Sequence, residues 1–396
     1  MSTYAEILEK KAKDWKCPDM MSQAKSDTVD RIPFSSPKMN WATYGGIPRR
    51  RFSEFFGKPG AGKSTSAVDI CKNAITVFDK EYNDKMLELR ASSSKTAAVE
   101  IADMEETGPK KILYVDIEHG FDRKWAETIG MDMERIDIMQ PGNVPAEELL
   151  QTLEELIQTG EVGLIVLDSI PSLVTTDELE KKLTEKTKIA TVATVMTLVM
   201  RKWVALLTRY DCTVILINQL RENMKNPFEP NTPGGLAVKF YSSLRIMFEL
   251  GSPIDFLGNT VPQYTADPAG YIVNARIMKL KTGANNRKNG TYFLMCDSGI
   301  RPEFDYAQLA LNDYGLIKKK AAWFTFVDPY TGELIETPDP LHEGKMKPLS
   351  VNGMAKVYEF LQSNQEYYQK LQKFILDDIM GVKPDADTEQ GSDEVL

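Results

Sequence analysis

The stretch FSEFFGKPGAGKST, residues 52–65, decides the fold of this chain. Its apolar start predicts a strand over 53–56, and the helical pattern TSAVDICKNAI begins at Thr65. Residues 57–64 fit G-x-x-x-x-G-K-[ST] in the strand–loop–helix context that this phosphate-binding motif requires. The stretch therefore predicts a nucleotide site at the end of a strand, and Thr65 is included among its expected nucleotide-binding residues.

This loop carries the residue types needed to hold a triphosphate. Gly57, Gly60 and Gly62 let backbone N–H groups approach phosphate oxygens without a Cβ clash, and the helix N-terminus adds a favourable dipole. We expect Lys63 to reach the β- and γ-phosphates and Ser64 to hold Mg²⁺. The expected cofactors are ATP and Mg²⁺.

A second strand, GLIVLDS over 163–169, ends in an acidic residue. In P-loop proteins such an acid steers the coordination sphere of Mg²⁺. An aspartate at a strand end is common and would not indicate a site by itself. Beside the phosphate-binding loop, we expect Asp168 to be the second metal residue.

A third strand is followed by an acidic cluster, in the stretch YVDIEHGFD, residues 114–122. Parallel strands deliver their carboxyl ends to one edge of the sheet, so Glu118 could lie beside the phosphate loop. There it could accept a proton from a water aligned on the γ-phosphate. The alternatives are a solvated loop acid or a helix N-cap group, and position alone does not separate them.

Strands and helices alternate from residue 52 onward, which predicts an α/β fold with a mainly parallel sheet and helices on both faces. The last strands lack intervening helices, so we expect the sheet to finish as an antiparallel extension. Helices are expected over 147–160 and 189–210. The expected strands are 53–56, 111–117, 163–169, 212–218, 242–250, 274–281 and 291–296.

The chain of 396 residues is too long for one ordinary core, so smaller attachments are expected. We predict an N-terminal helix and linker over 1–30 that serves as a polymerisation arm, and an ATPase core over 31–315. A charged, Ser/Ala-rich insertion is expected at 79–110. A small C-terminal domain over 316–383 and an acidic, disordered tail over 384–396 complete the prediction.

Composition narrows the classes of protein. No apolar run is long enough to cross a bilayer, and the four scattered cysteines favour reduced thiols, so we expect a cytoplasmic protein. Two histidines are too few for a histidine-rich metal site. The net charge of −9 argues weakly against nucleic acid, but basic stretches at 181–188 and 268–296 leave that question open.

Four stretches resemble RecA-type recombinases in order and spacing: IEHGFDRKWAETIGMD, VLDSIPSL, INQLRENM with NTPGGLAVKFYSSLRI, and KLKTG. The resemblance runs from about residue 27 to 330, and PGGLAVKFYSSLRI is far more specific than the phosphate-binding loop. It suggests a bacterial or bacteriophage homologue with a RecA-like core. It implies a protein that forms homo-oligomeric helical filaments on single-stranded DNA, hydrolyses ATP in a DNA-dependent way, and exchanges strands with duplex DNA.

The resemblance also implies roles for single residues. Glu118 matches the glutamate that activates the hydrolytic water, and Gln219 matches the glutamine that senses the γ-phosphate. Asp122 and Trp125 match the residues that contact adenine, although a tryptophan on an amphipathic helix is more often simply packed. Lys279 and Lys281 alternate along a strand and so face one side.

In this family such a lysine pair reaches the γ-phosphate bound by the neighbouring subunit, as an arginine finger does elsewhere. The alternative for these two lysines is a solvated edge strand that they protect from aggregation.

Two loops are implied to bind DNA, at about 182–189 and 220–235. Lysines there would neutralise phosphates, apolar side chains would wedge between bases, and glycines would let the backbone order on DNA. The alternative is two exposed polar loops. The expected DNA-binding residues are Lys182, Lys186, Lys188, Arg221, Met224, Lys225, Phe228, Gly234 and Gly235.

The chain departs from the family pattern at the insertion 79–110, in a slightly shorter second loop, and at Cys296, where bacterial members tend to have a tyrosine. A second function therefore remains open at this stage, a RecA-fold ATPase that acts as a ring motor or regulatory switch without strand exchange. NTPGGLAVKFYSSLRI argues against that alternative.

Overall fold

The computed structural model describes residues 3–14, 29–94, 96–181, 191–221, 232–284, 286–340, 342 and 344–381. The chain divides into two compact units, Met1–Asp30 and Arg31–Leu396. The first contains one described helix, α1 (Tyr4–Asp14), with a glutamate in its first turn and lysines in its last. These charges complement the helix dipole. The acidic tail predicted over 384–396 lies outside the described residues.

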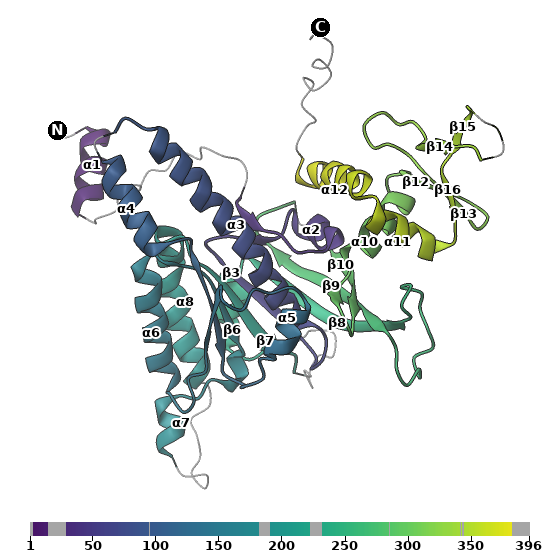
Figure 1. Ribbon diagram of the computed structural model, residues 1–396. Helices are drawn as coiled ribbons and strands as arrows, with labels where there is room; N and C mark the ends of the chain where they lie inside the picture. Colours follow the sequence, from purple (N-terminus) through teal and green to yellow (C-terminus); the bar gives the residue numbers. More distant parts are fainter. Residues whose placement is uncertain are drawn as a thin grey trace. The chain divides into compact units, whose positions relative to one another are not determined.

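The second unit is built on one large mixed sheet, as predicted (Figure 1). Within the described residues its strand order is β11-β10-β9-β8-β3-β7-β6-β4-β5. The strands from β8 to β5 run parallel, and those from β8 to β11 run antiparallel. The strands are β3 (Phe52–Gly57), β4 (Lys111–Asp116), β5 (Ile136–Met139), β6 (Val162–Asp168), β7 (Thr213–Gln219), β8 (Leu244–Ile254), β9 (Gly270–Leu280), β10 (Asn289–Met295) and β11 (Gly299–Ile300).

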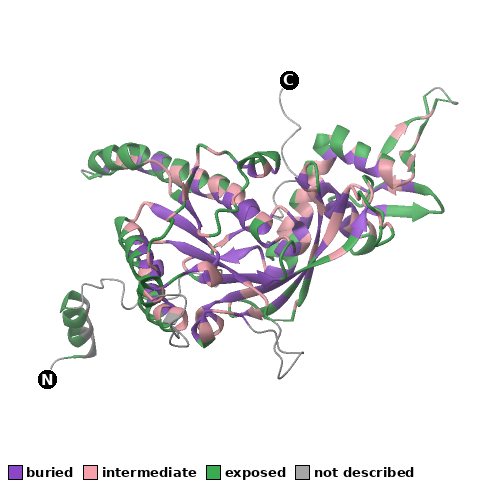
Figure 2. Ribbon diagram, turned by 90° about the horizontal axis from the view of Figure 1, so that it is seen from below, coloured by how far each residue is buried: buried purple, intermediate pink, exposed green. Residues whose placement is uncertain are grey.

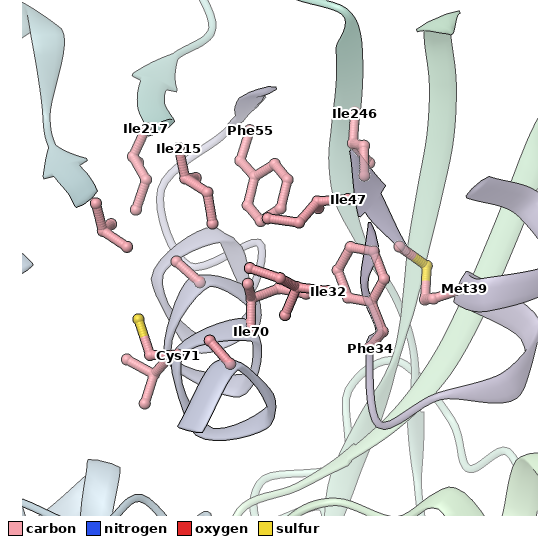
Figure 3. Packing of buried hydrophobic residues seen from close by; sticks show 14 of the residues in the cluster. Ile32, Phe34, Met39, Ile47, Phe55, Ile70, Cys71, Ile215, Ile217 and Ile246 are labelled. Atoms are coloured by element: carbon pink, nitrogen blue, oxygen red, sulfur yellow. The ribbon is translucent and has the colours of Figure 1, made fainter. Parts of the chain in front are cut away.

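The alternation of side chains along the central strands sets the two faces of this sheet. In β7, Ile215 and Ile217 pack on one face, whereas Val214 and Leu216 pack on the other. The first face is covered by α3 (Lys63–Ala91), α2 (Pro37–Thr43) and α5 (Arg123–Thr128). Figure 3 shows Ile215, Ile217 and Phe55 over Ile70 of α3. The second face is covered by α6 (Ala146–Thr159), α8 (Thr191–Arg209) and α9 (Gly235–Tyr241).

The parallel sheet is almost fully buried, as its position between two helical layers requires (Figure 2). Several strand predictions for this sheet need correction. The short strands β5 and β11 were not predicted, and β9 begins at Gly270 rather than at residue 274. β8 does not end at residue 250 but continues through an irregularity before Pro253. Gly251 and Pro253 resemble a strand end in the sequence, yet pairing with β9 carries the strand past them.

The insertion predicted at 79–110 is largely helical. The phosphate-loop helix α3 does not stop near residue 78 but runs for 29 residues, about 44 Å at about 1.5 Å per residue. A second helix, α4 (Ala97–Thr107), returns along it (Figure 1). Met86, Leu89 and Ala97 are buried in this hairpin. The long helix therefore belongs partly to the core and partly to the insertion.

The C-terminal residues form a small α/β layer on the antiparallel end of the sheet. Its core joins Phe293 and Met295 of β10 to side chains from three helices. The elements here are α10 (Pro302–Asn312), β12 (Ile317–Lys320), β13 (Trp323–Phe326), β14 (Glu336–Pro338), β15 (Met346–Pro348), β16 (Ser350–Asn352), α11 (Met354–Ser363) and α12 (Gln365–Met380).

None of the described helices combines the length and hydrophobicity needed to cross a bilayer.

A buried carboxyl group joins α10 to the start of α2. Asp305 is fully buried, and its Oδ2 accepts a hydrogen bond from Ser36 Oγ at 2.5 Å. Its Oδ1 makes no hydrogen bond to any described residue. Burial raises the pKa of Asp305 to about 7, although Ser36 and Lys38 oppose the rise.

Because the folded protein holds Asp305 protonated above the unfolded pKa, the free energy of unfolding should fall as pH rises from about 4 to about 7, and then stay level. The effect should reach up to about 4 kcal/mol. We expect Asp305→Asn to remove this fall, measured by urea denaturation at pH 5.5 and 8. The exposed Asp313→Asn is the control, and an identical pH slope in Asp305→Asn and wild type would contradict the assignment.

Candidate nucleotide-binding and catalytic site

The phosphate-binding loop leaves the carboxyl end of β3 and enters α3 at Lys63. Gly60 and Gly62 have φ of 72° and 87°, a left-handed conformation that favours glycine. A Cβ at Gly62 would lie 2.8 Å from the hydroxyl of Tyr292, and one at Gly57 would lie 2.2 Å from the carbonyl oxygen of Phe248. Close packing therefore requires glycine at positions 57 and 62, whatever the loop binds.

Lys63 lies folded over the loop, with its Nζ donating to the carbonyl oxygen of Lys58 at 2.8 Å. Burial lowers the pKa of Lys63, and the nearby carboxylates of Asp168 and Glu118 oppose that shift. Lys63 is buried, and its ammonium group donates to one neutral acceptor among the described residues. This arrangement is suited to a phosphate.

The two expected metal residues come together, Ser64 at the start of α3 and Asp168 at the end of β6. Ser64 Oγ donates to Asp168 Oδ2 at 2.8 Å, and Tyr114 OH donates to the same oxygen at 2.6 Å. Burial raises the pKa of Asp168, while these two hydrogen bonds lower it. A hydroxyl and a carboxylate are hard oxygen ligands, and Mg²⁺ in nucleotide sites takes few protein ligands and keeps several waters. The pair therefore fits Mg²⁺.

Glu118 lies at the same edge and is held by three donors. Its Oε1 accepts hydrogen bonds from Ser169 Oγ, from Ser172 Oγ at 2.9 Å and from Gln219 Nε2 at 3.1 Å. Glu118 does not cap a helix, because Asp122 is the N-cap residue of α5. The side chain is exposed but fixed in place. Residues 118 and 219, which are 101 positions apart, are thus in direct contact.

Asp122 and Trp125 lie beside the start of α3. Asp122 Oδ1 accepts from the backbone N–H of Trp125 at 2.9 Å, which begins α5. The indole N–H of Trp125 donates to Thr65 Oγ1 at 3.3 Å, and its ring packs partly against the core. Both residues therefore have a structural role here, and their contact with adenine stays a prediction.

Lys279, on β9, and Lys281, just after it, lie at the opposite end of the strands from the phosphate loop. Their Nζ atoms converge on the carbonyl oxygen of Phe240 at 2.8 and 2.9 Å, at the carboxyl end of α9. Burial, and then the charge of Lys281, lowers the pKa of Lys279 to about 8. Leu280 lies in register, through β8, with Ser53 at the start of β3. Four residues, about 13 Å at about 3.3 Å each, separate Ser53 from Gly57, so the lysines are remote from the phosphate loop of their own chain.

Most of the predicted DNA-binding residues cannot be placed. Arg221 is described and exposed, just beyond Gln219. Gly234 and Gly235 have φ of 87° and 78° and begin α9, and a Cβ at Gly235 would lie 3.0 Å from Ala193 Cβ. Gly235 thus serves the packing of α9 on α8, whereas a Cβ at Gly234 would lie 3.1 Å from Ile170 Cγ2. Outside the described residues lie Lys182, Lys186, Lys188, Met224, Lys225 and Phe228.

The end of the second loop is tied to the phosphate-loop strand. Asn218 Nδ2 donates to the carboxylate of Glu54 and to the carbonyl oxygen of Pro233, both at 2.9 Å. Glu54 is fully buried and also accepts from Arg245 of β8. Asn218 directly precedes Gln219, so the predicted γ-phosphate sensor and the end of the loop share one strand terminus.

Sequence reasoning missed several residues that support the site. Tyr292 OH lies 2.7 Å from Ser66 Oγ, beneath the phosphate loop. Asp116 accepts a hydrogen bond from the turn that carries Glu118, and Ser172 donates to the Glu118 side chain. A tyrosine or aspartate inside an apolar strand, and two serines after Asp168, were the only available signals.

Comparison with known proteins identifies the family of this chain. The RecA N-terminal domain family matches residues 86–300, more than half of the chain. Protein RecA of Rhodopirellula baltica is 30% identical over 84% of this chain and 80% of the relative. Protein RecA of Aquifex pyrophilus is 29% identical over 83% and 85%, and that of Thermus aquaticus 29% over 81% and 85%. Together these matches show that the chain belongs to the RecA family, and it is a RecA-type recombination protein.

Proposed function

We propose that this protein is a DNA-dependent ATPase that polymerises on single-stranded DNA in the cytoplasm, holds ATP between neighbouring copies and pairs the bound strand with homologous duplex DNA. The observation that carries the proposal is the hydrogen bond between Gln219 and Glu118 beside the phosphate loop. It joins the residue that would sense the γ-phosphate to the residue that would activate water. The ring-motor alternative is not favoured by the family match.

In this proposal the phosphate loop binds ATP through its backbone N–H groups and Lys63. Ser64 and Asp168 would hold Mg²⁺, which supplies positive charge against the phosphate oxygens when bound. Glu118 accepts a proton from the attacking water. Three side-chain donors hold the Glu118 carboxylate at the carboxyl ends of the strands, where it would meet that water.

Gln219 gives a route from nucleotide to DNA. A γ-phosphate oxygen would compete with Glu118 for the Gln219 amide, because both are charged acceptors and the amide N–H can donate to either. Any shift of Gln219 would act on Asn218 and so on Pro233, where the second loop ends. We propose this exchange as the step by which ATP orders that loop for DNA.

The proposal is tested by ATP hydrolysis with and without single-stranded DNA, combined with electron microscopy of the protein, DNA and a non-hydrolysable ATP analogue. We expect hydrolysis to rise with DNA and helical filaments to form. Hydrolysis that ignores DNA, or closed rings of fixed size, would support the ring-motor alternative instead.

The positions of Lys279 and Lys281 lead to a prediction about neighbouring copies. Since they are remote from the phosphate loop of their own chain, they would serve the ATP of an adjacent protomer. Lys279→Ala and Lys63→Ala proteins should each hydrolyse little ATP alone. Mixed in equal amounts, they should regain activity at roughly a quarter of interfaces, those pairing an intact phosphate loop with an intact lysine.

The measurement is the ATPase rate across a series of mixing ratios at constant total protein and saturating DNA. Lys320→Ala, which removes an exposed lysine of the C-terminal domain, is the matched control and should need no rescue. An absence of rescue at every ratio would count against a shared site.

A further inference from the structure

A buried aspartate at the end of β4 has no part in the function proposed so far. Asp116 is 1% exposed, and both of its carboxylate oxygens are occupied. Oδ1 accepts from the backbone N–H of Gly120 at 3.0 Å. Oδ2 accepts from the backbone N–H of Phe121 at 3.0 Å and from Gln140 Nε2 at 2.9 Å. Three donors offset the free-energy cost of burying this charge. An apolar residue of similar size would have no such cost to offset.

The donors show what Asp116 holds. Glu118 lies in the turn between β4 and α5, and the backbone N–H of Ile117 donates to the carbonyl oxygen of Asp168 at 2.7 Å on its N-terminal side. On the other side, Asp116 holds the peptides of Gly120 and Phe121. His119, between Glu118 and Gly120, has φ of 54°, a left-handed conformation that residues other than glycine rarely adopt. The turn must therefore hold His119 in this conformation. The backbone of Glu118 is therefore fixed at both ends.

The same turn is connected to the metal residue. Phe121 packs edge-on against Tyr114, with ring centroids 4.8 Å apart, and Tyr114 OH donates to Asp168. Asp116 cannot itself contact a nucleotide or a water at the phosphate edge, because it is buried and its oxygens already accept three hydrogen bonds. Its hydrogen bonds act on the reaction through the turn, and its charge, from the paired position on β4, also raises the pKa of Asp168.

We propose that Asp116 is a positioning residue for ATP hydrolysis, which closes the 117–121 turn and so aims the Glu118 carboxylate at the attacking water. This inference rests on the proposed role of Glu118 as the base. Misplacement of a catalytic group by about 1 Å can cost about 100-fold in rate without weakening ground-state binding. The loss should therefore appear in kcat and not in the affinity for ATP.

The test is a double-mutant cycle of Asp116→Asn and Glu118→Gln in the full chain with single-stranded DNA. Asparagine keeps the shape of Asp116 but replaces one acceptor oxygen by an NH₂ group, which cannot accept the hydrogen bonds that the aspartate accepts. We expect Asp116→Asn to lower kcat roughly 10- to 100-fold with KM for ATP and DNA affinity unchanged. In the Glu118→Gln background the same substitution should change kcat less than about twofold, because groups that act as a unit are not additive.

Asp137→Asn, an exposed carboxylate on the adjacent β5, is the matched control and should leave kcat unchanged. If Asp116→Asn does not fold, Gln140→Ala replaces it. Gln140 is exposed and donates one of the three hydrogen bonds, so its loss should lower kcat several-fold, and only while Glu118 is present.

The outcomes separate this inference from the function on which it rests. A slow Glu118→Gln with a normal Asp116→Asn, or with full additivity in the double variant, would overturn the positioning role alone. A loss of ATP affinity in the folded Asp116→Asn protein would also overturn it. A Glu118→Gln protein that hydrolyses ATP at the wild-type rate would remove the proposed base, and the positioning role with it.

Discussion

Lys63→Ala should abolish ATP binding at concentrations that saturate the wild-type protein, and hydrolysis and DNA-stimulated assembly should be lost with it. Lys63 is buried, and its ammonium group donates to one neutral carbonyl oxygen, that of Lys58. Triphosphate oxygens would replace that neutral partner with negatively charged ones, which adds the attraction between two opposite charges away from bulk water. Alanine removes all of this and leaves the loop backbone unchanged.

We expect the affinity for ATP to fall by at least about 100-fold, which corresponds to about 2.7 kcal/mol. Isothermal titration calorimetry with a non-hydrolysable analogue measures it directly. Lys85→Ala, on the solvent side of the same helix, controls for the removal of a lysine and should bind normally. Normal hydrolysis by Lys63→Ala would remove the phosphate-site argument entirely.

Glu118→Gln should bind ATP and form filaments on DNA but hydrolyse ATP about 100-fold more slowly or worse, within the range expected for loss of a general base. Glutamine retains an oxygen that can accept from Ser169 and Ser172, so the side chain should stay in place. It cannot accept a proton from water. Ground-state binding is therefore kept while the transition state loses its base.

Single-turnover hydrolysis with excess protein isolates this step from nucleotide release. The exposed Glu134→Gln is a matched control and should behave as wild type. If Glu118→Gln loses ATP binding instead, the residue is structural, and its contact with Gln219 serves to hold the strand ends rather than to activate water.

Local sequence determined much of this protein. The strand–loop–helix context of residues 52–65, the alternation of apolar residues along the strands, and the antiparallel extension all follow from short-range patterns, and the structure agrees with them. The same patterns failed where pairing overrides propensity. β8 passes Gly251 and Pro253 because β9 pairs with it, and α3 continues into the insertion, where it packs with α4 and where Met86 and Leu89 are buried.

Only the tertiary structure decided which distant residues meet. Glu118, Ser172 and Gln219 share one cluster because β4, β6 and β7 are neighbours with their carboxyl ends at one edge, and strand order is not written in any local pattern. The register across β9, β8 and β3 likewise puts Lys279 at the far edge from the phosphate loop. Residue types and spacing thus specify the chemistry that is available, whereas hydrogen-bonded pairing across the sheet determines which groups are close enough to act together.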